Sequence, residues 1–292
     1  MTSASELQSG KGHRDENFPV ASVLIAPKHR PAILAFYRFA RAADDIADHP
    51  TATPEEKLRL LEEFRSSLAG ESDAAELAVA LREVQKRCGI SAQHGLDLLE
   101  AFRRDVTVLR YPNWTALMDY CRYSAMPVGR FVLDVHGESQ DTWPANDALC
   151  AALQVINHLQ DCKKDHGALD RVYLPMDAMW AEGIGPEALM AKEASPALER
   201  VIKSLTRRTR TLLEQSRPFA GQISDARLAL EVTVIQRLAE DLTEKLLRRD
   251  PLSERVHHSK LELLPLLMSA TLRFFAERGR RKDGLHLAGH RP

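Results

Sequence analysis

Carboxylate side chains that could bind a metal ion recur in two segments of the sequence. In the first segment, Tyr37, Arg41, Asp44 and Asp48 follow one another at intervals of four, three and four residues, and Asp45 flanks them. Residues three or four apart share one face of a helix. Aspartate is unfavourable inside a helix and neighbouring carboxylates repel, whereas a hard divalent cation such as Mg²⁺ removes that repulsion. The spacing therefore favours a metal-binding helix face.

The second segment carries Asn157, Asp161 and Asp165 at intervals of four residues, which places three oxygen-bearing side chains on one helix face. Either stripe alone could be a solvated acidic surface. Two stripes that face one another across a helical bundle would instead hold Mg²⁺ ions and a substrate diphosphate. Such ions neutralise charge on a departing diphosphate, and Arg41 could bind its oxygens through two hydrogen bonds. The apolar residues beside both stripes predict a dry cavity for the resulting carbocation.

The elements that must position these stripes are helices. Apolar residues recur with helical spacing along most of the chain, and alternating β-branched runs are nearly absent. Pro31 and Pro54 stand near helix starts, whereas Pro127 and Gly129 predict a break within a long segment. We expect helices over residues 31–47, 54–69, 73–88, 91–106, 113–136, 144–165, 186–192, 196–217, 224–249 and 259–278.

Composition limits the class of protein. The 292 residues are 44% hydrophobic and carry a formal net charge of −1, which is enough apolar material for one large core and gives no indication of nucleic-acid binding. The four cysteines form no CxxC pair, so neither a zinc site nor a disulfide framework is expected. Residues 1–16 predict a flexible polar arm without a signal peptide, residues 17–278 one helical domain, and residues 279–292 a basic flexible tail. A cytoplasmic location is expected.

The motifs together resemble the squalene/phytoene synthase family over most of the chain. The matching segments are the first aspartate motif at 44–48 (DDIAD), the second at 157–165, the tyrosine segment at 120–129 (YCRYSAMPVG) and the segment at 170–175 (DRVYLP). The resemblance implies an all-α, single-domain prenyl synthase bundle that encloses a central apolar cavity. It also implies an enzyme that uses more than one Mg²⁺ ion.

Within the family, residues 16–22 (ENFPVAS) and 161–165 (DCKKD) resemble the bacterial hopanoid branch, in which presqualene diphosphate is converted to hydroxysqualene by water capture. This resemblance implies that Asp44, Asp48, Asn157, Asp161 and Asp165 hold the metal. It assigns catalytic roles to the acidic residues, Tyr120 and Tyr123, and substrate binding to Phe18, Tyr37, Arg41, Asn157, Gln160 and Arg171. Gln160 departs from the family, in which many members have arginine before the second-motif aspartate.

The resemblance further implies a supply of presqualene diphosphate from its synthase and a downstream reductase. NADPH is not expected, because a cation that captures water needs no reductant. The GxGxxA pattern at 183–188 follows no strand, which argues against a Rossmann-type NADPH site. A dehydrosqualene, phytoene or squalene synthase that condenses two prenyl diphosphates head-to-head is the alternative enzyme. A non-catalytic assembly protein is the alternative of another class. The segment 261–282 is either a core helix with a basic end or a peripheral contact with an anionic membrane surface.

Overall fold

The computed structural model describes residues 24–288, which are helical almost throughout and contain no strand. One isolated parallel bridge joins Arg110 to Val172. The helices are α1 (Arg30–Ala47), α2 (Pro54–Ala69), α3 (Glu76–Cys88), α4 (Gln93–Thr107), α5 (Trp114–Ser124), α6 (Met126–His136), α7 (Trp143–Leu169), α8 (Met176–Ala181), α9 (Pro196–Ser216), α10 (Phe219–Gln222), α11 (Ala226–Leu246) and α12 (Lys260–Ala288), with short 3₁₀ turns at Gln140–Thr142 and Pro186–Met190. The predicted all-α fold is confirmed.

Helix starts follow the local chemistry of the sequence. Thr53 and Glu56 form a reciprocal capping box at α2, and the Asn113 side chain accepts a hydrogen bond from the Ala116 amide at α5. The expected break in the segment 113–136 occurs at Ala125, before Pro127 rather than at it. Proline is tolerated in the first turn of a helix, so α6 begins where the sequence suggested a kink.

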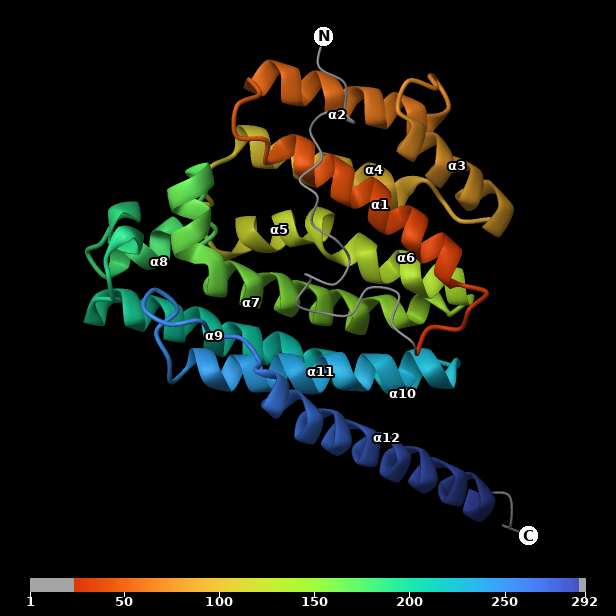
Figure 1. Cartoon of the computed structure of the whole chain (residues 1–292). Helices are drawn as coiled ribbons and strands as arrows, with labels where there is room; N and C mark the ends of the chain where they lie inside the picture. The colour runs from red at the N-terminus through yellow and green to blue at the C-terminus, as the bar shows by residue number, and fades with distance from the viewer. Residues whose placement is uncertain (1–23, 289–292) are drawn as a thin grey trace.

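The helices form layers around α7. Figure 1 shows α2 and α3 on one side, then α1 and α4, then α5, α6 and α7, and finally α9 and α11. One apolar core is formed by helices α1, α2, α3 and α4 and includes Phe39 and Phe64. A larger core surrounds α7 and includes Leu149 and Ile156. Helices α1 and α7, which carry the two stripes, therefore lie in separate layers of the bundle.

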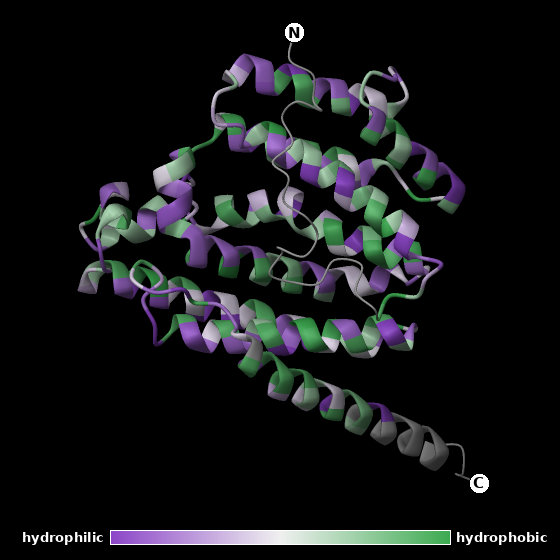
Figure 2. Ribbon diagram, viewed as in Figure 1, coloured by the Kyte–Doolittle hydropathy of each residue, from purple (hydrophilic) through white to green (hydrophobic). Residues whose placement is uncertain are grey.

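Helix α12 differs from the expected C-terminal region. It continues to Ala288, whereas the sequence indicated a flexible tail from residue 279. Its inner face packs on α11 through Leu266 and Ala270, and the helix diverges from the bundle in Figure 1. Its apolar side chains include exposed ones, with Leu261 at 89% and Phe275 at 63% exposure. Figure 2 shows hydrophobic residues recurring along the coloured part of α12. No helix within residues 24–288 has both the length and the apolar character needed to cross a membrane.

Candidate active site

The two aspartate stripes face one cavity. Asp44 and Asp48 of α1 line it from one side, and Asp161 and Asp165 of α7 line it from the other. The cavity has a volume of about 670 Å³, and its lining also includes Arg41, Asn157, Gln160, Lys164 and the loop residues 251–255 and 257. The sequence predicted that the stripes would meet, and the structure brings them together.

On α1, the Arg41 guanidinium contacts both members of the aspartate pair. Its Nη1 lies 2.9 Å from Asp44 Oδ2 and its Nη2 lies 2.8 Å from Asp45 Oδ1. Asp45 is only 8% exposed, whereas a third of the Asp44 side chain remains accessible. Arg41 is therefore held at the cavity wall by one buried carboxylate and one cavity-facing carboxylate.

Asp48 is oriented by an arginine far away in the sequence. Arg171 is 6% exposed, and its Nη1 donates to Asp48 Oδ1 at 2.5 Å while its Nη2 donates to the Ala47 carbonyl at 3.0 Å. Its Nε donates to the backbone carbonyl of Asp105 at 2.8 Å. Arg171, which the resemblance assigned to substrate binding, thus fixes the end of α1 to α4.

The acidic groups crowd one another in this cavity. Burial and the neighbouring Asp161 raise the pKa of Asp165 from its ordinary value to about 7. Burial and then the Asp48 carboxylate also raise the pKa of Asp44, although Arg41 opposes the change. Carboxylates that repel one another in a partly dry site are suited to binding hard divalent cations, which prefer oxygen ligands.

Asp105 was missed in the sequence. Tyr120 Oη donates to Asp105 Oδ2 at 2.9 Å and Tyr173 Oη donates to Oδ1 at 2.8 Å, so this buried carboxylate joins α4, α5 and the segment after α7. Burial raises its pKa to about 6, against the effect of nearby Arg171. The His158 ring stacks on Tyr173 at 3.6 Å, and burial lowers its pKa to about 3. No spacing pattern includes Asp105, because its partners Tyr120 and Tyr173 lie 15 and 68 residues away in the sequence.

The two tyrosines expected to act together are separated. Tyr120 contacts Asp105 and lines a polar recess with Asp44 and Asp165. Tyr123 lies outside the lining of the described cavities and instead packs beneath the Arg104 guanidinium, 4.3 Å from the ring centroid. The structure thus does not bring Tyr123 to the lining of these cavities, and its catalytic role stays a prediction. Phe18, the other aromatic candidate, lies outside the described residues.

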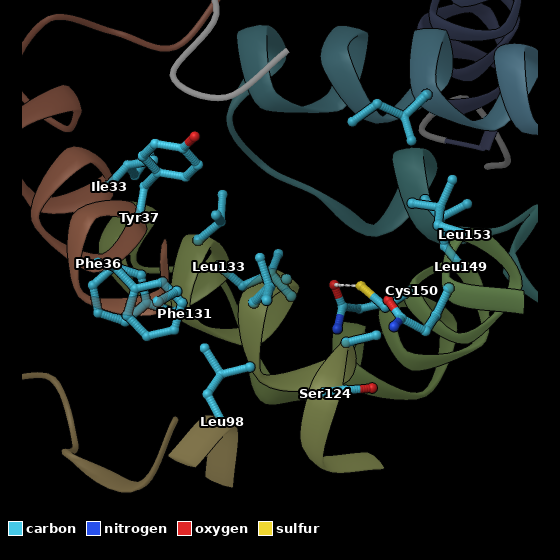
Figure 3. A pocket seen from close by; sticks show the side chains of 18 of the residues that line it. Ile33, Phe36, Tyr37, Leu98, Ser124, Phe131, Leu133, Leu149, Cys150 and Leu153 are labelled. Carbon is cyan, nitrogen blue, oxygen red and sulfur yellow. Dashed lines mark hydrogen bonds between the residues drawn. The ribbon is translucent and has the colours of Figure 1, made fainter. Parts of the chain in front are cut away.

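An apolar cavity of about 440 Å³ adjoins the acidic one, and the two share Arg41 and Asp44 in their linings. Tyr37 lines it as expected, together with side chains from α4, α6, α7 and α11. Phe36 stacks on Phe131 with ring centroids 4.0 Å apart, and both rings appear on one wall in Figure 3. The arrangement places a hydrocarbon-sized apolar space directly behind the acidic groups.

A basic and polar loop covers the acidic cavity. Gln160 Nε2 donates to the Val256 carbonyl, and Lys163 Nζ donates to the Leu252 carbonyl at 3.3 Å. Arg255 and His257 of this loop line the cavity along with Lys164. Gln160 therefore positions the loop through a buried bond. Arg255 went unrecognised in the sequence because the residues between α11 and α12 follow no motif.

Comparison with known proteins identifies relatives in sequence and in fold. The squalene/phytoene synthase family profile matches residues 12–262. A hydroxysqualene synthase of Zymomonas mobilis is 58% identical over 91% of both chains, and one of Rhodopseudomonas palustris is 55% identical over 90% of both. The crystal structure of a squalene synthase from Alicyclobacillus acidocaldarius has a TM-score of 0.71 and 31% identity, and it covers 84% of this chain and 92% of its own. A dehydrosqualene synthase structure has a TM-score of 0.75 at 21% identity over 94% and 95% of the two chains, which shows the shared fold.

The chain therefore belongs to the squalene/phytoene synthase family, as its motifs indicated. Enzymes of this family process prenyl diphosphates and typically use a divalent metal.

Proposed function

We propose that this member of the squalene/phytoene synthase family converts presqualene diphosphate and water into hydroxysqualene and diphosphate, and that it requires Mg²⁺. The observation that carries this proposal is the junction of an acidic cavity and an apolar cavity at Arg41 and Asp44. A prenyl diphosphate placed across this junction has its charged group among the metal ligands and its hydrocarbon in the apolar space. The 53–58% identity to three hydroxysqualene synthases supports this product.

The donor set fits magnesium. Its members offer carboxylate or amide oxygens and no sulfur or imidazole nitrogen, which is the ligand preference of Mg²⁺. The residues that would hold the ions are Asp44, Asp48, Asn157, Asp161 and Asp165. When bound, the ions supply positive charge that stabilises the departing diphosphate.

The chain's own cations contribute on the same side. Arg41 lies at the junction and can donate to diphosphate oxygens while Asp45 keeps its guanidinium in place. Lys164 and Arg255 line the opposite part of the acidic cavity, where they can bind the released diphosphate. Gln160 acts indirectly, because its side chain holds the loop that carries Arg255.

The cavity walls determine where the cation and water can meet. Phe36, Phe131 and Tyr37 offer aromatic surface, which stabilises a carbocation without attacking it. The polar recess lined by Asp105, Tyr120 and His158 adjoins the acidic cavity and supplies hydrogen-bonding groups beside the reaction space. Water that enters from this recess forms the new C–O bond, and its proton is lost to solvent or diphosphate.

The proposed reaction requires enzymes that supply its substrate and use its product. Presqualene diphosphate would come from its synthase and hydroxysqualene would pass to a reductase, without NADPH at this chain. The exposed apolar side chains of α12, including Leu264 and Leu272, support peripheral contact with the cytoplasmic membrane face, where an apolar product would leave.

The test is product analysis with purified protein, Mg²⁺ and presqualene diphosphate, with and without NADPH. We expect hydroxysqualene in both reactions, with one ¹⁸O atom when the solvent is H₂¹⁸O. Asp161→Asn should lose diphosphate release, whereas Asp177→Asn, an exposed change outside the cavities, should retain it. A triterpene hydrocarbon as the only product would favour the condensing alternative. So would product formed from two prenyl diphosphates when no presqualene diphosphate is added. Unchanged diphosphate release in an Asp44→Asn/Asp161→Asn double variant would refute the role of both stripes.

A further inference from the structure

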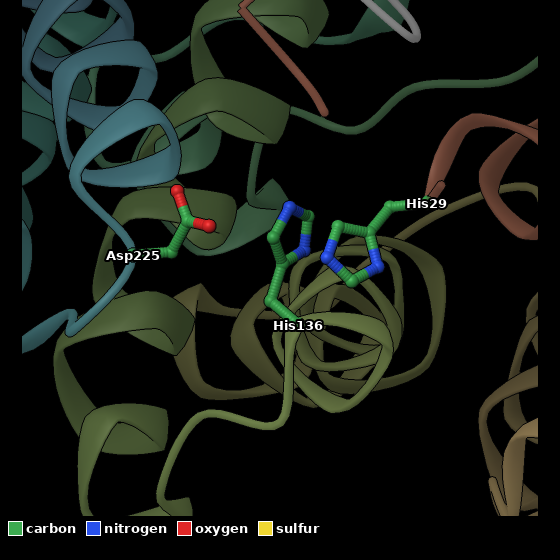
Figure 4. Close-up of side chains that lie close together, drawn as sticks. All are labelled: His29, His136 and Asp225. Atoms are coloured by element: carbon green, nitrogen blue, oxygen red, sulfur yellow. The ribbon is translucent and has the colours of Figure 1, made fainter. Parts of the chain in front are cut away.

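A second group of ligand-type side chains lies at the opposite end of the apolar cavity from the aspartates. His29 stands at the N-cap of α1, His136 is the last residue of α6, and Asp225 is the N-cap of α11. Their ligand atoms all lie within 4.8 Å of one another, and Figure 4 shows the three side chains gathered between their helices. No sequence spacing links them, because each comes from a different part of the chain.

Neighbouring groups hold these side chains in a state suited to metal binding. His136 Nδ1 lies 2.8 Å from the Val132 carbonyl, which can only accept, so this nitrogen carries the proton in the neutral ring, and Nε2 is the nitrogen that can bind a metal. Asp225 Oδ1 accepts from the amides of Arg227 and Leu228, and neither of these bonds uses Oδ2. The site therefore offers an imidazole nitrogen and a carboxylate oxygen as metal ligands.

The segments that carry the ligands are also tied to one another. Glu138, just after α6, accepts from the backbone amides of Ser224 and Asp225 at 2.8 and 2.7 Å. The His29 and His136 rings lie with centroids 4.2 Å apart.

We propose that His29, His136 and Asp225 bind one divalent transition-metal ion, with Zn²⁺ as the representative ion, separately from the magnesium of the aspartate stripes. Two imidazole nitrogens and one carboxylate form a set that favours zinc over magnesium, and water would complete a tetrahedral shell. Bonds of about 2.0–2.1 Å bring tetrahedral ligand atoms to about 3.3 Å apart, so ligand atoms that lie within 4.8 Å of one another must approach by at most about 1.5 Å. All three side chains are partly exposed and can make this rotation.

An ion at this position would join the three helices that close one end of the apolar cavity. Ile33 of α1, Val132 of α6 and Leu228 of α11 line the cavity, and each lies within about one turn of a ligand. The ion would therefore fix the wall against which the far end of the hydrocarbon rests, without contact with the diphosphate.

The experiment is titration of the chelator-treated full-length protein with Zn²⁺ by calorimetry, and with Co²⁺ by visible absorption, in excess Mg²⁺ so that the aspartate stripes are occupied. We expect one tight ion per chain, a rise in melting temperature and the absorption of tetrahedral Co²⁺. His136→Ala and Asp225→Asn should each weaken binding at least tenfold, and asparagine can still cap α11. His258→Gln, a change beside Asp241 on α11, should leave binding unchanged.

Circular dichroism distinguishes loss of the site from loss of the fold in these variants. Absence of saturable Zn²⁺ binding to the unaltered protein would overturn the proposal, as would equal affinity in folded His136→Ala and Asp225→Asn proteins. Diphosphate release from the Mg²⁺-loaded enzyme tests the proposed reaction independently, so failure of one proposal leaves the other standing.

Discussion

Replacing Asp165 by asparagine should stabilise the metal-free protein while it abolishes diphosphate release. Asp165 lies beside Asp161 in a partly dry cavity, and its pKa is raised to about 7. Above that pH the carboxylate is ionised in the folded protein, which lowers the stability of the metal-free state because of burial and repulsion by Asp161. A bound cation would offset this loss. Asparagine keeps the shape of the side chain and removes the charge, so the repulsion disappears together with the metal ligand.

The magnitude follows from the displaced pKa. The difference between the ordinary value of 3.8 and about 7 corresponds to about 4 kcal/mol, at about 1.4 kcal/mol for each tenfold change. Asp165 is partly exposed, so solvent screening reduces the realised effect. We expect Asp165→Asn to raise the free energy of unfolding by about 1–2 kcal/mol at pH 8.

The sign depends on pH. A carboxyl group with a raised pKa in the folded state binds more protons when folded, so its contribution favours folding at low pH and is lost as pH rises from about 4 through 7. Below pH 4 the group is protonated in both states. The gain from Asp165→Asn should therefore be small at pH 4 and complete above pH 7.

Urea unfolding of the chelator-treated proteins at pH 5 and pH 8 measures this effect. Asp177→Asn, an exposed change in the first turn of α8, is the matched control and should shift stability by less than about 0.5 kcal/mol. Addition of Mg²⁺ with inorganic diphosphate should stabilise the unaltered protein more than Asp165→Asn. Equal or lower stability of Asp165→Asn at pH 8, or a gain of the same size at pH 5, would refute the argument from charge crowding.

Two further substitutions test the packing around the cavities. Gly129→Ala would place a methyl group 1.9 Å from Asn146 Oδ1, so it should lower the free energy of unfolding in urea by about 1–3 kcal/mol. In the control Gly167→Ala, the methyl group meets only a flexible methionine, so stability should stay the same or rise. Asp105→Ala removes the acceptor of two buried phenols and the negative charge near the buried Arg171, whose hydrogen bond to the backbone carbonyl remains, and should cost about 3–5 kcal/mol. Exposed Asp119→Ala should cost less than about 1 kcal/mol. If Gly129→Ala and Gly167→Ala, or Asp105→Ala and Asp119→Ala, lost similar amounts of stability, the energetic importance assigned to these contacts would be refuted.

Local sequence chemistry predicted the helices well. The caps at Thr53 and Asn113 and the helical spacing of apolar residues depend on neighbours within a few positions, so α2 and α5 begin where expected. The helix predicted over 259–278 ended too early, because α12 continues to Ala288 through the glycines and basic residues that suggested its end. Glycine weakens a helix without forbidding it.

The site was predictable only where its residues repeat along one helix. Asp161 and Asp165 share a face by their spacing, and so does Asp48 with Asp44. The bonds that orient these groups cross long sequence intervals: Arg171 reaches back to Asp48, and Tyr173 reaches Asp105. No local period encodes such contacts, so the hydrogen-bonded centre beneath the cavity was invisible before the fold was known.

The aspartate pair on α1 shows why two adjacent acids are useful where only one faces the cavity. Asp44 opens to the cavity, whereas Asp45 is 8% exposed and its carboxylate lies 2.8 Å from the Arg41 guanidinium. If a cation binds Asp44, the Asp44 carboxylate no longer balances the positive charge of Arg41. The ion pair between Arg41 and Asp45 remains. A guanidinium that is already fixed can meet diphosphate charge without reorganising, which is the main requirement for electrostatic catalysis. We therefore infer that Asp44 serves as ligand and Asp45 as the anchor of the arginine.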